Sequence, residues 1–389
     1  MKPGTPGFIG SRLRSAREAR GISAVSLADV AGVTRAAISQ YEHGKQTPSP
    51  QVLRTIADRL NLPVHFFLLP VQTTTAGPIF YRSFTSATKL ARLRAQQRYD
   101  WFRAIVTELR RAIRFPTYTL ADLCVSTPWK RTTMDEIEDT AEQVRCALDV
   151  AQQPLPNTVL LFERAGVVIG RHEFDSAALD AFSHWPEGEP NPFIILGADK
   201  ASAVRSRFDA AHELGHLLLH RGVTERELRD REMMKVIEAQ ANRFASALLL
   251  PKEGFAKAIG PVKLDRLLVL KATWGASVGA MISRCSHLGL VNEDESKKLW
   301  MNYARRGWKR REPYDDLLAP EEPRFVRRSL ELVLEKGTIG REQLLHHLAL
   351  HPRDVEDLVG MPPGTLSRGA NPTQEDVLPM EQMLIRFPQ

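Results

Sequence analysis

The sequence predicts a mainly α-helical chain with a small β-sheet: five short helices at the N-terminus, a central α+β part and a helical C-terminal region. Three observations predict it. Residues 8–68 form a run of short helical patterns separated by glycines. Residues 158–174 hold two short apolar runs around Ala165-Gly166, which predict a β-hairpin, and residues 192–197 hold another run that favours a strand. Two longer helical patterns follow, at about 200–221 and 225–249, and end before Pro251.

Composition limits the classes of protein that the chain can belong to. The 389 residues are 43% hydrophobic and 25% charged, which is typical of a globular protein with a sizeable core. The net charge of +7 favours an anionic partner such as nucleic acid. No apolar run approaches the roughly 18 residues of a membrane span, and the N-terminus lacks the apolar core of a signal peptide. Three scattered cysteines make no disulfide framework, so we expect a cytoplasmic protein.

Breaks in the pattern predict four segments. We expect a first domain at 1–70, a helical linker at 71–130, a second domain at 131–260, and a helical C-terminal region of unknown role at 261–389.

The first segment contains two short helical patterns joined by a tight turn at Gly32, with Thr34 as the N-cap of the second. Two short helices joined in this way form a helix-turn-helix, whose second helix can enter the major groove of DNA. Residues 1–70 carry 9 Lys or Arg and 4 Asp or Glu, which favours DNA. The alternative is a small helical domain that docks onto protein partners.

The outward side chains of the second helix and the turn after it are the candidate DNA contacts. They are Thr34, Arg35, Ala36, Ser39, Gln40 and Lys45. Arg35 and Gln40 are suited to base edges, and Ser39 and Lys45 to bases or phosphates. Because one such module covers a half-site, we expect a homodimer on a double-stranded operator, which would make the protein nucleoid-associated when bound.

The run LADVAGVTRAAISQYEHGKQTPS resembles the phage-repressor-like, XRE-type helix-turn-helix family. The resemblance covers about 60 residues and carries the family's Leu-Ala, Gly-Val, Ile-Ser, Tyr-Glu-x-Gly and Pro landmarks in order. The family often has a phosphate-binding Gln near the start of the first of the two helices, where this chain has Ala24. One backbone contact of the family is therefore in doubt.

The central segment contains an HExxH motif on a helical pattern. His212 and His216 lie one turn apart on the same face, so both rings can reach one cation, and imidazole nitrogen suits zinc. Glu213 is the candidate catalytic residue, a general base for water that attacks a carbonyl. His220 lies about 12 Å along the helix from His212, at roughly 1.5 Å per residue, so it is predicted to be a helix-end residue and not a ligand of the same ion.

A third ligand is expected from the next helix. Glu238 shares a stripe with the small, inward residues Ala241 and Ala245, and a carboxylate on the apolar side of a helix needs a partner. It would complete a set of two histidines and one glutamate, with Asn242 one turn on as a hydrogen-bond partner of a ligand. The alternative for Glu238 is a salt bridge to Arg205 or Arg243.

FDAAHELGHLLLH, followed by ExxAN and FASALLLP, resembles the ImmA/IrrE-type metallopeptidase family. The resemblance covers most of residues 79–313 and implies a zincin-like metallopeptidase domain with a zinc ion, or manganese, on His212, His216 and Glu238 and with Glu213 as base. The family often has Glu where this chain has Gln240.

Two functions follow. The first is a DNA-bound regulator whose zinc metalloendopeptidase domain cleaves a repressor-like protein, as the resemblance implies. The second is a non-proteolytic XRE-family regulator or antitoxin, in which the metal fold senses a signal or binds a partner such as a cognate toxin. An adjacent repressor gene would favour the first, and an adjacent toxin gene the second.

Overall fold

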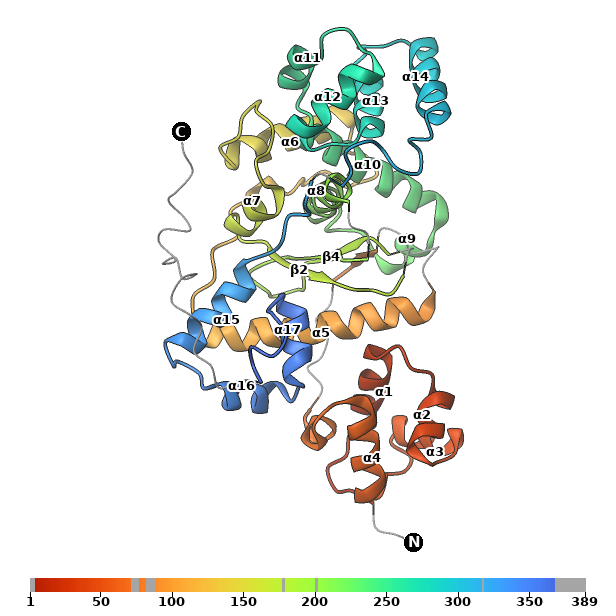
Figure 1. The fold of residues 1–389 in the computed structure, drawn as a ribbon, viewed down its shortest axis with the longest axis vertical. Helices are drawn as coiled ribbons and strands as arrows, with labels where there is room; N and C mark the ends of the chain where they lie inside the picture. Colours follow the sequence, from red (N-terminus) through yellow and green to blue (C-terminus); the bar gives the residue numbers. More distant parts are fainter. Residues whose placement is uncertain are drawn as a thin grey trace. The chain divides into compact units, whose positions relative to one another are not determined.

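The computed structural model describes residues 4–70, 77–81, 88–176, 179–199, 202–316 and 318–367 (Figure 1). The chain divides into two compact units: unit 1 is Met1–Thr74, Thr88–Phe115 and Arg324–Gln389, and unit 2 is Thr75–Ala87 and Pro116–Pro323. The described residues form seventeen α-helices, two 3₁₀ helices and one four-stranded sheet. This confirms the predicted fold class, mainly α with a small sheet.

Unit 1 is entirely helical in its described residues apart from turns. Its elements are α1 (Gly10–Ala19), α2 (Ala24–Ala31), α3 (Arg35–Glu42), α4 (Pro50–Leu60), the 3₁₀ helix η1 (Val64–Leu68), α5 (Lys89–Ala112), α15 (Phe325–Glu335), α16 (Arg341–Leu348) and α17 (Pro352–Val359). The first five are the predicted N-terminal bundle, the fifth being a 3₁₀ helix. Helices α15, α16 and α17 each pack against the long helix α5.

Local signals in the sequence place the short helices of the bundle. Ser23, Thr34 and Ser49 each accept a hydrogen bond from a backbone N–H in the first turn of α2, α3 and α4. Gly32 ends α2 in the left-handed region, with φ of 64°, which lets the chain turn sharply into α3. Leu13 and Ile38 fill the centre of the bundle and are fully buried.

Unit 2 holds the sheet. Its strands are β1 (Ile79–Tyr81), β2 (Val168–His172), β3 (Ala181–His184) and β4 (Phe193–Gly197), in the spatial order β1-β3-β4-β2. Strands β2 and β4 are parallel, whereas β3 runs antiparallel to both β4 and β1. Its helices are η2 (Ala121–Leu123), α6 (Met134–Ala147), α7 (Thr158–Arg164), α8 (Ala203–Leu219), α9 (Glu225–Arg229), α10 (Arg231–Leu249), α11 (Lys252–Ile259), α12 (Leu264–Trp274), α13 (Val278–His287) and α14 (Glu293–Arg305).

Helix α8 lies at the centre of unit 2. It packs against β3 and β4 on one side and against α10 on the other, and α6 covers α10 in turn (Figure 1). The approach of α10 depends on Gly215, because a Cβ there would lie 3.0 Å from the ring of Phe244. Helix α8 is therefore buried on nearly every side, and polar groups on it need partners inside the protein.

The structure corrects two local expectations. The hairpin expected at 158–174 is wrong: Thr158–Arg164 is α7, because Asn157 accepts a hydrogen bond from the N–H of Leu160 and caps a helix there. Strand β2 then pairs in parallel with β4, not with a hairpin partner. The helix expected at 225–249 is broken at Asp230, whose side chain caps α10.

The division into a domain at 1–70, a linker at 71–130, a domain at 131–260 and a C-terminal region at 261–389 stays a prediction. Part of the last segment, residues 368–389, lies outside the described residues. Of the helices that the structure describes, none combines the length and the apolar composition needed to cross a bilayer.

Candidate metal centre and helix-turn-helix surface

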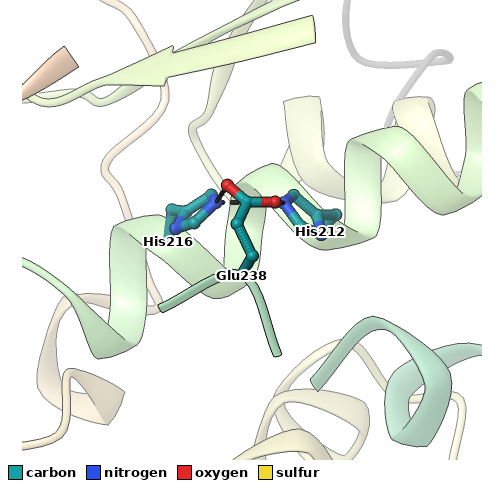
Figure 2. A group of neighbouring side chains, drawn as sticks. All are labelled: His212, His216 and Glu238. Atoms are coloured by element: carbon teal, nitrogen blue, oxygen red, sulfur yellow. Dashed lines mark hydrogen bonds and ion pairs between the residues drawn. The ribbon is translucent and has the colours of Figure 1, made fainter. Parts of the chain in front are cut away.

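Three side chains from α8 and α10 converge on one point in unit 2 (Figure 2). The Nε2 atoms of His212 and His216, one helical turn apart, are 3.0 Å from each other. The carboxylate of Glu238 reaches across from α10, with Oε2 3.4 Å from Nε2 of His212 and Oε1 3.6 Å from Nε2 of His216. Among the described residues, this is the group of three or more such side chains that could hold a metal ion.

The residues present fit a divalent cation. A tetrahedral ion bound at about 2.0–2.1 Å keeps its ligand atoms about 3.3 Å apart, and the three separations lie on either side of that value. Oε1 of Glu238 is buried, and its distance of 3.6 Å from Nε2 of His216 is longer than a normal hydrogen bond. The alternative partners of Glu238 are engaged elsewhere, Arg205 with Asp180 and Arg243 with Glu138.

The charge state of Glu238 also suits a ligand. Burial alone would raise the pKa of this carboxyl, but its close interaction with the imidazole rings of His212 and His216 outweighs burial and holds the pKa below its ordinary value. Glu238 is therefore a carboxylate at neutral pH, which is the form that binds a metal.

A chain of hydrogen bonds behind the two histidines fixes which nitrogen each one offers. Nδ1 of His212 lies 3.0 Å from Oδ1 of Asn242, the contact expected for a second-layer partner. Nδ1 of His216 lies 3.0 Å from Nδ1 of His220, and Nε2 of His220 lies 2.9 Å from Oε1 of Gln240.

The proton positions along this series of hydrogen bonds follow from the contact of Gln240 at its end. The amide nitrogen of Gln240 donates to the carbonyl of Trp129 at 2.8 Å, so Oε1 of Gln240 accepts from Nε2–H of His220. Burial lowers the pKa of His220 to about 3, so its ring is neutral and Nδ1 is an acceptor. Nδ1–H of His216 donates to it, which leaves Nε2 of His216 with a free lone pair toward the candidate cation.

His220 thus has a place in the site that the sequence did not predict. It caps the end of α8, as expected, but it is fully buried, and its Nδ1 is committed to His216. Gln240 was also missed as a partner. The signal available was the spacing of three histidines at four-residue steps, which puts each ring against the next on one helix face.

Glu213, the predicted base, is also fully buried. Its Oε2 accepts a hydrogen bond of 2.7 Å from Oγ of Ser183 on β3. This hydrogen bond restricts the orientation of the carboxylate, which belongs to the residue directly after His212. Its role as base stays a prediction.

The ring of Phe80, on the short strand β1, lies against the rings of His216 and His220. It stacks on His216 with ring centroids 4.7 Å apart and an interplanar angle of 7°, and it lies 6.0 Å from the ring of His220. Phe80 is itself 4% exposed. Nothing in the sequence singled it out, because its strand is three residues long and lies more than 130 residues before the motif.

The predicted DNA contacts lie at the surface of the N-terminal bundle. Thr34 caps α3 by accepting from the N–H of Ala37 at 3.1 Å, and Ala24 is the first residue of α2. The exposed members of the set are Thr34, Arg35, Ala36, Ser39 and Lys45. Gln40 is partly buried. The arrangement leaves the outer face of α3 open to a partner, and each residue's part in contacting DNA stays a prediction.

Comparison with known proteins identifies the class of each region. Residues 13–67 match the helix-turn-helix family of the XRE type, and residues 162–286 match a peptidase family described as the IrrE N-terminal-like domain. The chain therefore combines an N-terminal helix-turn-helix domain with an ImmA/IrrE-type metallopeptidase-like domain.

A similar curated protein is the HTH-type transcriptional regulator SutR of Escherichia coli (strain K12). The two are 35% identical over 68 residues, which is 18% of this chain and 38% of SutR. The chain thus matches well under half the length of that relative.

Proposed function

We propose that this protein is a DNA-binding transcriptional regulator whose central domain is a metal-dependent peptidase acting on a repressor-like protein. The observation that carries the proposal is the set His212, His216 and Glu238 at ligand spacing, with a buried carboxylate at Glu213, in a chain that also presents an open helix α3. The match to a peptidase family and the match to a transcriptional regulator support its two halves.

The chemistry proposed is hydrolysis of a peptide bond. Zinc bound by the three ligands, or manganese, would supply a polarised water and would draw charge from the substrate carbonyl. Glu213 accepts a proton from the water as its oxygen attacks the carbonyl carbon, and passes that proton to the amide nitrogen as the C–N bond breaks. Ser183 holds the carboxylate in position, and His220 keeps Nε2 of His216 unprotonated.

The test uses Glu213→Gln, which keeps the shape of the side chain and the acceptor for Ser183. With zinc added, wild-type protein should cleave candidate repressors encoded by neighbouring genes, and the variant should be slower by about 10²- to 10⁴-fold while binding zinc equally. Glu253→Gln, an exposed acid on α11, is the matched control. Identical cleavage by wild type and Glu213→Gln would refute the catalytic role.

The DNA-binding half of the proposal has its own test. Footprinting on the promoter of the chain's own gene should show protection over two half-sites if the protein binds as a homodimer. Arg35→Ala should weaken binding by about 1–3 kcal/mol and relax the preference for one base pair. Lys252→Ala, an exposed basic residue at the start of α11, should change affinity little. Equal losses in both variants would mean that only overall charge matters.

One observation favours the second candidate, a non-proteolytic regulator or antitoxin. His212, Glu213 and His216 are all 0% exposed, so a protein substrate does not reach them in this conformation. In that case the metal would stabilise the fold or report its own concentration. Footprinting with and without a chelator separates the candidates, because a metal sensor should lose protection when the metal is removed even where Glu213→Gln has no effect.

A further inference from the structure

We infer that β1 occupies the position of a peptide substrate on β3, so that the site accepts an extended peptide carrying a large apolar side chain and is closed by the chain's own strand until β1 leaves. This inference rests on the proposed peptidase function and names its substrate class and its regulation.

The pairing of β1 carries the first step. Strand β3 packs against α8, the helix that bears the histidines. One edge of β3 pairs with β4, and β1 pairs antiparallel with the other edge. Strand β1 has three residues and is one of the two edge strands of the sheet. Without it, β3 would expose an edge of backbone N–H and C=O groups, and such an edge binds extended peptides by adding a strand.

The register of β1 on β3 puts Phe80 beside Ser183 and His216. Phe80 is the direct partner of Ser183, so their side chains lie on the same face of the sheet. On that face Ser183 donates to Glu213, and the Phe80 ring lies flat on His216. One residue of the added strand is therefore presented to the proposed base and to a proposed metal ligand at once.

The surroundings of the Phe80 ring define a specificity pocket. The ring packs in a separate cluster of buried apolar residues, formed with Trp129, Val223, Leu228 and Ile237. In strand addition the backbone provides affinity and pockets for alternate side chains provide selectivity. A peptide that replaces β1 should accordingly place a Phe, or a residue of similar size and polarity, in this pocket.

The segment that carries β1 interrupts unit 1 along the chain. Residues 75–87 belong to unit 2, whereas the chain on both sides of them belongs to unit 1, which includes the helix-turn-helix. Two of the four points at which the chain passes from one unit to the other therefore flank the segment that carries β1. Because a tethered strand competes with a free peptide at high effective concentration, wild-type protein should bind such a peptide weakly.

The experiment measures binding of a fluorescein-labelled peptide with the sequence GPIFYRS, that of residues 77–83, to the full chain by anisotropy. Glu213→Gln is present throughout, so binding is measured without hydrolysis. Adding Phe80→Ala, which removes the side chain that anchors β1, should tighten binding by about tenfold or more. The same peptide with Asp in place of its Phe should not bind.

Phe255→Ala is the matched control, because it removes an equally buried ring in α11, far from β1 in sequence. It should leave peptide affinity at the wild-type level. If Phe80→Ala is folded and binds zinc but binds the peptide no better than wild type does, the inference is overturned.

A second variant decides the matter if Phe80→Ala fails to fold. Ile79 and His184 are direct partners, so Ile79→Cys with His184→Cys, in a Cys146→Ser background, can form a cross-strand disulfide. The oxidised form should lose the residual peptide binding that the reduced form retains, and equal binding by both forms overturns the inference. If peptide binds as expected but protein with Glu213 intact never cleaves it, the peptidase proposal fails while the assignment of β1 stands.

Discussion

The two candidate sites of this chain are built in opposite ways. In the helix-turn-helix the predicted contacts lie on the surface of one helix and the turn after it, and caps within a few residues hold them in place. In the metal centre the side chains from α8 are fully buried, and their partners come from β1, β3 and α10. A buried polar group needs a partner wherever the fold can provide one, whereas a surface group has water. A substitution in the surface site should therefore affect only the contact of that side chain. A substitution in the buried site should also disturb the side chains that are hydrogen-bonded to it.

The largest expected effect is loss of a ligand. Glu238→Gln removes the charge that neutralises the cation, and zinc affinity should fall by more than the roughly 10- to 100-fold that follows loss of an outer partner. Calorimetric titration with zinc measures it. Glu232→Gln, on the exposed start of the same helix α10, is the control and should bind zinc like wild type. If both variants bind zinc equally well, the ion is not held where the three side chains converge.

The next effect tests the chain of hydrogen bonds behind His216. Gln240→Leu keeps the volume of the side chain but leaves Nε2 of His220 without its acceptor and the carbonyl of Trp129 without its donor. Zinc affinity should fall about 10- to 100-fold.

Gln240→Glu is the conservative variant for that test, because its carboxylate still accepts from His220. It should restore most of the zinc affinity although it still lacks the donor to Trp129. A merely structural role for Gln240 predicts instead that Glu fails as badly as Leu, since both lose that donor.

The same contrast explains how much the sequence could predict. The cap at Thr34 and the turn at Gly32 depend on residues that are close together in the sequence, so the helix-turn-helix could be placed from the sequence alone. The four-residue spacing of His212 and His216 on one helix put both rings on one face, and the stripe of α10 pointed to Glu238.

The rest depends on contacts between residues far apart in the chain. Ser183 and Phe80 enter the site through the register of β1 on β3, which no local pattern encodes. The apolar run at 158–164 suits a strand and a buried helix equally well, so its pattern alone does not distinguish them. The hydrogen bond from the N–H of Leu160 to Asn157 caps a helix there.

The smallest effect concerns the cap of α3. Thr34→Ala removes the acceptor for the N–H of Ala37 and should destabilise the helix-turn-helix by about 1 kcal/mol, whereas Thr34→Ser keeps the acceptor and most of the stability. Hydrogen exchange of the α3 amides in the full chain measures the change. Thr55→Ala is the control, because its hydroxyl bonds to a carbonyl within α4 and caps nothing. Zinc affinity should stay unchanged in all three variants, and a loss of zinc binding in Thr34→Ala would show that the two sites do not fail independently.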